Sequence, residues 1–453
     1  MRPYVPPEGS IPTQAVPDLS TVRALHLVGI GGSGMRNMAR LFAARGIVVS
    51  GSDLKESGAV RDLRAAGSVV AIGHDADNVG AVDAVVVSSA IGPRNPELLA
   101  AAARGIPVWS RAQALAAAAA DRRTLAVSGT HGKTTTTSML ALILDRAGAD
   151  PSFVIGGEPN ETGGGARAGA SDLFVVEADE SDGTFLLLCP TVGVVTNVEV
   201  DHVDFYRGGR DEIEAAFAAF AARSDHVVVC ADDPGAMRAT TGIGRPTTTY
   251  GTGTGVDVRV ETVSLGPTGA RGRVTIGQRT HDLVIGVDGA HNLLNAAAAV
   301  ATAAIVGVDP AVAVAALADF TGVHRRFEHR GSVRGADFFD DYGHVPTELA
   351  VTLGTASRRG ARRVIAVFQP HRYSRTQALW RELGESLVQA DLVVVTDVYG
   401  ADQDPIPGVT GKLVVRGIAE AAPGHRIVYL PHRADVVRFL DREVRAGDLV
   451  VTM

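Results

Sequence analysis

The sequence predicts an α/β fold made of three tandem domains, and three observations support this prediction. The chain has 453 residues, enough for three domains of roughly 150 residues each. Strand-length apolar runs alternate with helix-length segments along most of the chain, which is typical of right-handed βαβ units and parallel sheets. Two glycine-rich turns, near residues 29 and 129, directly follow such apolar runs.

Each domain is expected from its own series of elements. Residues 1–20 are proline-rich and are predicted to form a flexible lead-in. Residues 21–120 alternate runs such as "ALHLVGI" and "IVVSGSD" with helical segments, predicting a Rossmann-like domain. Residues 121–322 contain the runs "RRTLAVSG" and "DLFVVEAD" and then antiparallel hairpins over 247–288, predicting a central P-loop ATPase domain with a mixed sheet. Residues 323–453, with "RRVIAVFQP" and "DLVVVTDVYG", predict a doubly wound, Rossmann-like C-terminal domain.

Composition excludes several classes of protein. The formal net charge is -7, which argues against a chain that wraps nucleic acid. No apolar run reaches the length of a membrane helix, and the first residues do not resemble a signal peptide. The only two cysteines, Cys189 and Cys230, lie far apart in the sequence, as expected in a reducing compartment. We therefore expect a cytoplasmic protein with no membrane partner.

The stretch "TLAVSGTHGKTTTTSML" predicts a phosphate loop of unusual length. The general pattern G-x-x-x-x-G-K-[ST] requires a glycine at position 127, where the chain has Val127. The loop nevertheless joins an apolar strand to a helix, so that backbone N–H groups and the helix N-terminus can hold phosphates. Lys133 supplies a charge for the outer phosphates, and the Thr134 hydroxyl is placed to bind Mg²⁺. The predicted ATP-binding loop comprises Gly129, Thr130, His131, Gly132, Lys133, Thr134 and Thr135.

Carboxylates follow two neighbouring strands of the predicted central sheet. Glu177 comes directly after a buried run and is the first choice as a metal ligand, since nucleotide-bound Mg²⁺ takes one or two carboxylates. His202 follows the next run, beside Asp201. From spacing alone, His202 is equally well a second ligand or a loop residue.

The first glycine-rich turn predicts a diphosphate site. Gly29, Gly31 and Gly34 have G-x-G-x-x-G spacing between a strand and a helix, and Asp53 ends the next strand. These residues favour NAD, but a UDP-linked compound satisfies the same geometry.

Basic and aromatic residues follow the strands of the third domain. Arg372 and Arg375, in "FQPHRYSRT", are candidates for a carboxylate or phosphate clamp, with a solvated basic turn as the alternative. Tyr342, His344 and His371 are expected at the same sheet edge. The segment "HRRFEHR" is either a surface hinge or the source of a charge for the γ-phosphate.

Taken together, the motifs resemble the Mur ligases of bacterial cell-wall synthesis. The resemblance spans nearly the whole chain from Leu25 and includes "GTHGKTT", "VEADESD", "HNLLNAAAAVATA", "HRRFE", "DDYGHVPTE" and "FQPHRYSRT". It implies that ATP phosphorylates the lactyl carboxylate of UDP-N-acetylmuramate and that the amine of L-alanine then attacks the acyl phosphate. It further implies peptidoglycan precursor synthesis by a monomer or homodimer that uses ATP and Mg²⁺.

The resemblance also implies roles for individual residues. Lys133 would contact the β- and γ-phosphates, Thr134 one Mg²⁺, and Glu177 with His202 a second Mg²⁺. Arg326 would reach the γ-phosphate. Three sets complete the site: adenosine contacts from His291, Asn292 and Asn295; an alanine pocket from Tyr342, His344, His371, Arg372 and Arg375; and a uridine-diphosphate site from Gly29, Gly31, Gly32, Gly34, Asp53, His74 and Ser89.

Two residues depart from the family pattern, and three other functions stay open. Arg36 places a bulky cation where a small residue is usual, and Val345 replaces a second histidine. The alternatives are a ligase that recycles a tripeptide onto UDP-N-acetylmuramate, an NAD-dependent oxidoreductase, and a non-catalytic nucleotide-binding module.

Overall fold

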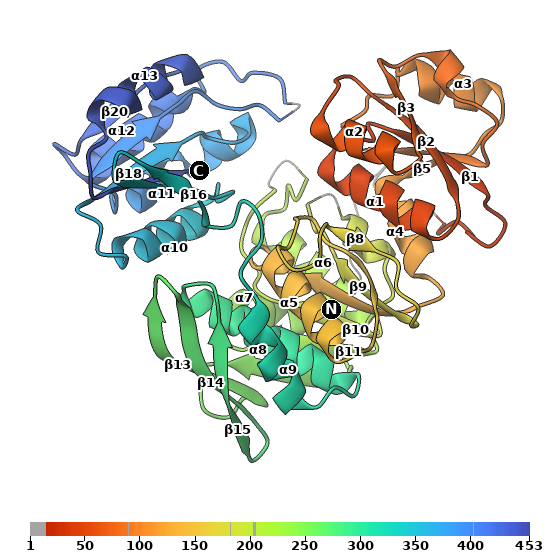
Figure 1. Cartoon of the computed structure of the whole chain (residues 1–453), viewed down its shortest axis with the longest axis horizontal. Coiled ribbons are helices and arrows are strands. Elements are labelled where there is room, and N and C mark those ends of the chain that lie inside the picture. The colour runs from red at the N-terminus through yellow and green to blue at the C-terminus, as the bar shows by residue number, and fades with distance from the viewer. Residues whose placement is uncertain (1–14, 89, 182, 203–204, 402) are drawn as a thin grey trace.

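The computed structural model describes residues 15–88, 90–181, 183–202, 205–401 and 403–453, and these ranges form three separate β-sheets. Figure 1 shows three bodies: the N-terminal domain at the upper right, the central domain below, and the C-terminal domain at the upper left. The predicted α/β fold with three domains is therefore confirmed. No helix in the described ranges is long and apolar enough to cross a membrane.

The N-terminal domain is a parallel sheet flanked by helices. Its strands are β1 (Ala24–Val28), β2 (Val48–Asp53), β3 (Val69–Ile72), β4 (Ala84–Val87) and β5 (Val108–Ser110); its helices are α1 (Ser33–Ala44), α2 (Gly58–Ala65), α3 (Pro96–Ala103), α4 (Arg111–Ala119) and the 3-10 helix η2 (Ala76–Asn78). The strand order is β3-β2-β1-β4-β5. Because the order reverses between β1 and β4, the glycine-rich turn after β1 lies at the switch point where open α/β sheets bind ligands.

The central domain has a mixed sheet. Its strands are β6 (Arg123–Ser128), β7 (Ser152–Val154), β8 (Ala166–Arg167), β9 (Leu173–Glu177), β10 (Val192–Val195), β11 (His226–Cys230), β12 (Thr247–Gly251), β13 (Val258–Gly266), β14 (Gly269–Ile276) and β15 (Arg279–Ile285). Its helices are α5 (Lys133–Arg146), α6 (Arg210–Ala222), α7 (Pro234–Thr240), α8 (Ala290–Ile305), α9 (Pro310–Ala316) and the 3-10 helices η3 (Thr184–Leu187) and η4 (Leu317–Asp319).

The order of this sheet is β15-β14-β13-β12-β11-β10-β6-β9-β7-β8. Strands β13 to β15 pair antiparallel, as predicted, whereas β12 joins the parallel part beside β11. Strand β6, which leads into the phosphate loop, lies between β9 and β10. The ends of these two strands therefore flank the loop.

The C-terminal domain again has a largely parallel sheet. Its strands are β16 (Glu328–Val333), β17 (Ala336–Asp340), β18 (Arg363–Phe368), β19 (Leu392–Val395), β20 (Ile427–Tyr429) and β21 (Asp448–Thr452); its helices are α10 (Pro346–Ser357), α11 (Tyr373–Leu387), α12 (Gly411–Ala421) and α13 (Arg433–Glu443). The order is β16-β17-β21-β18-β19-β20, with only β16 antiparallel. Strand β21 lies inside the sheet, and its Val450 and Val451 are fully buried.

Apolar packing joins the first two domains and leaves the third distinct. One core cluster contains Met38 and Phe42 of α1 together with Phe174 and Val176 of β9. The two clusters on the faces of the C-terminal sheet contain only residues of that domain. We infer that the N-terminal and central domains pack as one unit, because burial of shared apolar surface stabilises their contact.

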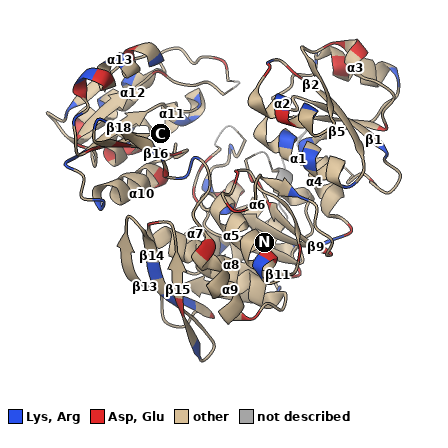
Figure 2. Cartoon of the chain, viewed as in Figure 1, with Lys and Arg blue, Asp and Glu red and all other residues tan. Residues whose placement is uncertain are grey.

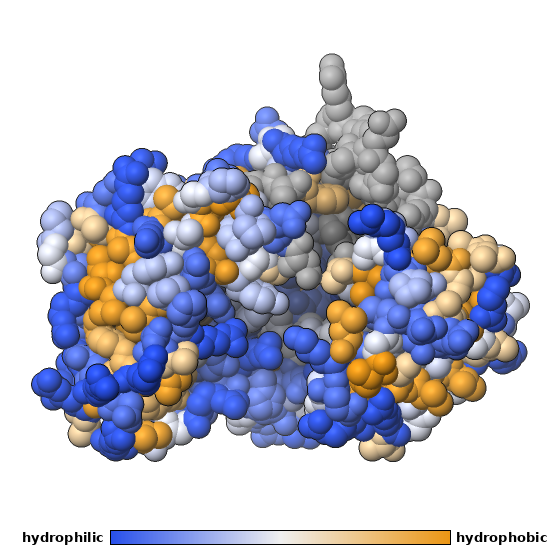
Figure 3. Space-filling view, turned by 90° about the horizontal axis from the view of Figure 1, so that it is seen from above, coloured by the Kyte–Doolittle hydropathy of each residue, from blue (hydrophilic) through white to orange (hydrophobic). Residues whose placement is uncertain are grey.

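The surface between the upper domains is hydrophilic. Figure 3, seen from above, shows the C-terminal domain at the left and the N-terminal domain at the right, with a recess between them and hydrophilic residues on its floor. Figure 2 shows acidic and basic residues mixed in all three domains.

Candidate active site

The phosphate loop lies between β6 and α5 and is held in shape by the end of β10. Gly129 and Gly132 have positive φ of 141° and 79°, and a Cβ on Gly129 would lie 1.9 Å from Thr196 Oγ1. The His131 N–H donates to Asn197 Oδ1 at 2.7 Å. The Thr130 N–H donates to the Asn197 carbonyl at 3.0 Å. Both glycines are thus required by the backbone, and the loop shape depends on a neighbouring strand.

The side chain of Lys133 folds back onto its own loop and is 14% exposed. Its ammonium donates to the Gly129 carbonyl at 2.6 Å and to the Glu180 carboxylate at 2.8 Å. Burial lowers the Lys133 pKa, but the nearby charges of Glu180 and Asp179 outweigh it and the pKa is raised. Burial also raises the pKa of Glu180, although Lys133 pulls it the other way. Lys133 is therefore a charged lysine whose partner is a carboxylate at the end of β9.

Two of the three predicted metal ligands lie together. The Thr134 hydroxyl donates to Glu177 Oε1 at 3.1 Å, and Glu177 Oε2 accepts from the Gly156 N–H. His202 instead lies against other carboxylates, with its Nε2 3.4 Å from Asp201 and 3.8 Å from Glu180. Within the described residues, no three His, Cys, Asp or Glu side chains form a cluster able to hold a metal ion.

A cavity of about 770 Å³ opens beside the loop, between the central and C-terminal domains. The predicted nucleotide residues that line it are His131, Gly132, Thr134, Thr135, His291, Asn292, Asn295 and Arg326. Helix α8 brings its first turns to the loop, since a Cβ on Gly132 would lie 2.5 Å from Asn295 Oδ1. Burial lowers the pKa of His291 to about 4, so this ring is neutral at pH 7.

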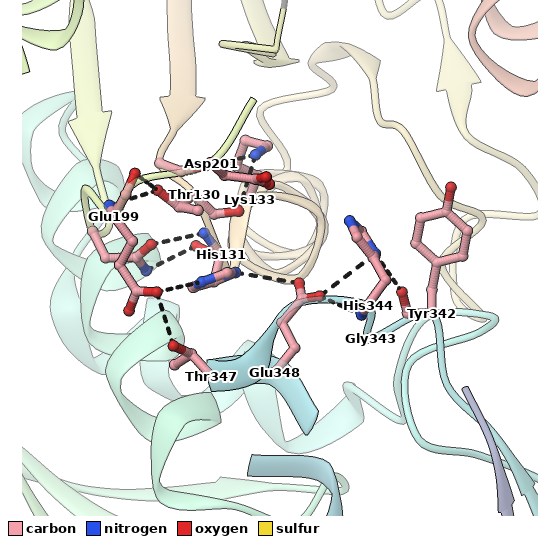
Figure 4. Close-up of polar contacts among 12 residues, drawn as sticks. Thr130, His131, Lys133, Glu199, Asp201, Tyr342, Gly343, His344, Thr347 and Glu348 are labelled. Carbon is pink, nitrogen blue, oxygen red and sulfur yellow. Dashed lines mark hydrogen bonds and ion pairs between the residues drawn. The ribbon is translucent and has the colours of Figure 1, made fainter. Parts of the chain in front are cut away.

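Polar contacts connect the central domain to the C-terminal domain. Arg375 donates to both carboxylate oxygens of Asp201, at 3.1 and 3.0 Å. The two side chains are 5% and 9% exposed. The Thr347 hydroxyl donates to Glu199 Oε2 at 2.8 Å. Figure 4 shows the contact between Thr347 and Glu199 beside the phosphate loop, together with those of His131 and Glu348.

The predicted alanine pocket forms an aromatic cluster. The ring of His344 lies 5.3 Å from that of Tyr342 and 5.4 Å from that of His371. Burial lowers the pKa of His344 to about 4 and of His371 to about 3. His344 Nδ1 lies 2.8 Å from the Tyr342 carbonyl, which only accepts, so Nδ1 carries the proton and Nε2 is an acceptor. Arg372 is the N-cap residue of helix α11 and has a positive φ of 68°.

The predicted uridine-diphosphate residues lie in the N-terminal domain. The Gly31 N–H donates to Asp53 Oδ2 at 2.9 Å, so Asp53 closes the glycine-rich turn. His74 Nδ1 lies 2.9 Å from the Ser52 hydroxyl. That hydroxyl donates to the fully buried Glu97. Gly29, Gly32 and Gly34 complete the turn and the start of α1, while Ser89 lies outside the described residues.

Four residues of the site were missed from the sequence. Arg111 begins α4, lies against Gly34, and has its Nη2 3.6 Å from Asp179 Oδ2, so it links the glycine-rich turn to the ATP domain. The carboxylate of Glu97 lies beside the predicted site residue His74, and those of Glu199 and Glu348 lie beside His131. Spacing along the chain does not single them out, because the histidines that they contact are distant in the sequence, although Glu348 stands in the family segment "DDYGHVPTE".

The two departures from the family pattern have structural explanations. Arg36 forms an ion pair with Glu158 of the central domain. Val345 is 4% exposed and precedes α10, so an apolar contact occupies that position.

The fold and the site define an α/β protein with a short phosphate-loop turn beside an interdomain cavity and a second glycine-rich turn in its N-terminal domain. Three family models match the chain: "Mur ligase family, catalytic domain" over residues 24–123, "Mur ligase middle domain" over 127–303, and "Mur ligase, glutamate ligase domain" over 325–453. The chain belongs to the Mur ligase family, whose members are ATP-dependent ligases.

Individual relatives and solved structures agree with membership of the Mur ligase family. The chain is 45% identical to the UDP-N-acetylmuramate–L-alanine ligase of Thermobifida fusca, over 98% of this chain and 95% of the relative. It is 46% identical to the ligase of the same name from Acidothermus cellulolyticus, over 94% and 91%. A solved UDP-N-acetylmuramate-alanine ligase from Thermotoga maritima matches with a TM-score of 0.81 and 28% identity, over 95% of both chains. A solved murein peptide ligase from Psychrobacter arcticus matches with a TM-score of 0.74 and 26% identity, over 95% of both chains.

Proposed function

We propose that the chain joins L-alanine to the lactyl carboxylate of UDP-N-acetylmuramate at the expense of ATP, in peptidoglycan precursor synthesis. The observation that carries the proposal is the continuous set of contacts from the phosphate loop through His131 and Glu348 to His344 in the predicted alanine pocket. The identity of 45% to a ligase of this name, over almost the whole chain, supports the same substrates.

The reaction has two steps with balanced chemistry. A carboxylate oxygen of the sugar attacks the γ-phosphorus of ATP, and ADP leaves. The amine of L-alanine then attacks the acyl carbon, a proton leaves the nitrogen, and inorganic phosphate departs. Because the protein forms no covalent bond here, positioning and charge neutralisation supply most of the catalysis.

The loop and the domain junction hold the phosphates in this proposal. Lys133 exchanges its contact with Glu180 for the β- and γ-phosphates, which are better placed acceptors for a buried ammonium. Arg326, which lines the cavity, supplies a second charge. His291, Asn292 and Asn295 contact the nucleoside.

A magnesium ion fits the residues at the end of β9. Thr134 and Glu177 present oxygen ligands in contact with each other, which suits Mg²⁺, and the buried Nδ1 of His202 lacks a hydrogen-bond partner within the described residues. Thr134 would hold one such ion, and Glu177 with His202 a second. Each ion, when bound, would neutralise charge on the phosphates.

The sugar nucleotide occupies the N-terminal domain. Its diphosphate lies on the turn of Gly29, Gly31, Gly32 and Gly34, near Asp53 and His74. Arg111 stands between this turn and Asp179, so it faces the path from the diphosphate to the γ-phosphate. We propose that it binds an anionic group of the sugar substrate.

The amino acid occupies the C-terminal domain. Arg372 holds its carboxylate end, Arg375 fixes the edge of the pocket through its two bonds to Asp201, and Tyr342, His344 and His371 surround its amine. The neutral Nε2 of His344 accepts a hydrogen bond from that amine. We further propose a cytoplasmic location, since the two cysteines, Cys189 and Cys230, are free thiols in the structure.

The test measures phosphate release from ATP with UDP-N-acetylmuramate while the second substrate is varied. We expect release with L-alanine. Release only with a tripeptide would show a recycling ligase instead, and release with neither would refute the proposal. The N-terminal domain can be probed with NAD, whose binding would favour an oxidoreductase.

A lysine variant tests the domain assignment. We expect Lys133→Ala to abolish turnover while UDP-sugar binding survives, because the two sites lie in different domains. Lys412→Ala, an exposed lysine of α12, is the matched control and should keep turnover. Loss of sugar binding in Lys133→Ala would contradict the assignment.

A further inference from the structure

Glu348 contacts three predicted site residues that come from three different segments. It lies in the first turn of α10, and its side chain is 15% exposed. Its Oε1 is 3.3 Å from His131 Nδ1 and 3.6 Å from Arg326 Nη1. Its Oε2 accepts from the backbone N–H of His344 at 3.0 Å. One carboxylate thus contacts the phosphate loop and the start of the alanine pocket, as Figure 4 shows, and also Arg326 at the domain junction.

The ring of His131 is held from both domains. Its Nδ1 faces Glu348 of the C-terminal domain, and its Nε2 lies 3.2 Å from Glu199 Oε2 of the central domain. Ionised carboxylates only accept hydrogen bonds, so both ring nitrogens must donate, and the ring is an imidazolium. Burial lowers the His131 pKa, but these two carboxylates outweigh it and raise the pKa to about 9.

From this geometry we infer that Glu348 is a positioning residue, which closes the C-terminal domain over the phosphate loop through His131 and thereby places Arg326 and His344. The inference rests on the proposed function for the roles of those partners. It assigns no contact between Glu348 and substrate. Closure brings the charge of Arg326 to the cavity that the loop lines and holds the neutral ring of His344 beside Glu348, an arrangement that the two-step reaction requires.

A helix-capping role alone does not account for these contacts. The bond from the His344 N–H to Oε2 is of the kind that stabilises a helix start, and it needs only one oxygen. The other oxygen faces His131 and Arg326, which belong to no part of α10. Capping and closure therefore use different atoms and can be separated by mutation.

The variant Glu348→Gln separates the capping role from the closing role. The amide oxygen of glutamine can still cap the helix, whereas its NH₂ group cannot accept a hydrogen bond from His131 or Arg326. The matched control is Glu443→Gln, which removes the carboxylate of a C-terminal ion pair with Arg363 at 19% exposure, outside the cavity lining. We expect Glu348→Gln to lower kcat at least tenfold, with KM for UDP-N-acetylmuramate within twofold of wild type. The control should keep kcat within twofold. A kcat of Glu348→Gln above half the wild-type value would overturn the inference.

A double-mutant cycle identifies the partner. If Glu348 acts through His131, the variant Glu348→Gln/His131→Asn should fall no further than the more damaged single variant. Effects that multiply would show that Glu348 acts independently of His131 and would overturn the proposed route.

Closure is measured separately from catalysis. We expect small-angle scattering of the full chain to give a larger radius of gyration for Glu348→Gln than for wild type and for Glu443→Gln. Identical values would overturn the inference. If the wild-type chain releases no phosphate with L-alanine, the proposed function fails, while the scattering comparison still tests Glu348.

Discussion

Replacing Arg375 with alanine should disconnect the C-terminal domain from the catalytic centre. The guanidinium makes two parallel bonds to Asp201 at 3.1 and 3.0 Å, and both side chains are buried. Burial raises the pKa of Asp201, but His202 and Arg375 outweigh it and hold this pKa well below its usual range. Without Arg375, the ionised Asp201 would lie buried in the closed arrangement with both of its hydrogen bonds to the guanidinium lost.

The magnitude follows from the burial. Removing one partner of a buried ion pair costs about 3–5 kcal/mol. At about 1.36 kcal/mol per factor of ten, this corresponds to roughly a hundredfold to several-thousandfold loss of the closed arrangement. When the C-terminal domain opens, Asp201 is exposed to water. The lost ion pair therefore lowers the stability of the closed arrangement rather than the free energy of unfolding of either domain.

The assay combines turnover with binding and stability. We expect Arg375→Ala to lower phosphate release at least about a hundredfold, with ATP affinity kept and the free energy of unfolding little changed. Arg375→Lys should be intermediate, because lysine keeps the charge but loses the two-bond geometry. Arg238→Ala is the control: it removes a similar two-bond pair with Glu214 where the arginine is 47% exposed, and it should leave turnover unchanged. Turnover of Arg375→Ala within threefold of wild type would refute this reasoning.

Three further predictions follow from local geometry. Gly129→Ala should abolish ATP binding, measured by calorimetry, because the new Cβ would lie 1.9 Å from Thr196 Oγ1. Gly46→Ala, also at positive φ but with no atom within 4 Å, should keep binding. The buried carboxylate of Glu97 accepts hydrogen bonds from Ser52 and Asn78 and anchors the loop that carries His74. Glu97→Gln should therefore lower the free energy of unfolding, measured in urea, by about 1–3 kcal/mol. It should also raise KM for the UDP-sugar but not KM for ATP. The pKa of His131 is raised in the folded protein, so its contribution to domain closure should be complete below pH 6.5 and be lost as the pH rises through about 9. Small-angle scattering from pH 6 to 10 should therefore show the C-terminal domain opening in the wild type and not in His131→Asn.

Some of the site could be predicted from sequence because its signals are local. Gly129, Gly132, Lys133 and Thr134 lie on one strand-turn-helix segment, where spacing along the chain nearly equals spacing in the fold. Glu177 was found for a related reason, since the carboxyl ends of adjacent parallel strands meet at one edge of the sheet. The structure places its carboxylate 3.1 Å from the Thr134 hydroxyl.

Other features of the site had no local signal. His202 and Arg372 were candidates from the sequence, but neither residue type indicates their positive φ of 52° and 68°. Glu348 stands in the family segment "DDYGHVPTE" and Asp201 beside His202, but their partners lie 217 and 174 positions away, so spacing along the chain could not pair them. Helix α10 contains threonines and a glycine, which weaken the helical pattern.

The sequence by itself determined the alternation of strands and helices, the phosphate loop and its short form, and the family, because these depend on neighbours along the chain. Only the tertiary structure decided that the first two domains share a core while the third is attached through buried ionic contacts. The reason is physical: a charge can remain buried at a domain interface only where a partner from another segment meets it, and the chain order does not specify that meeting.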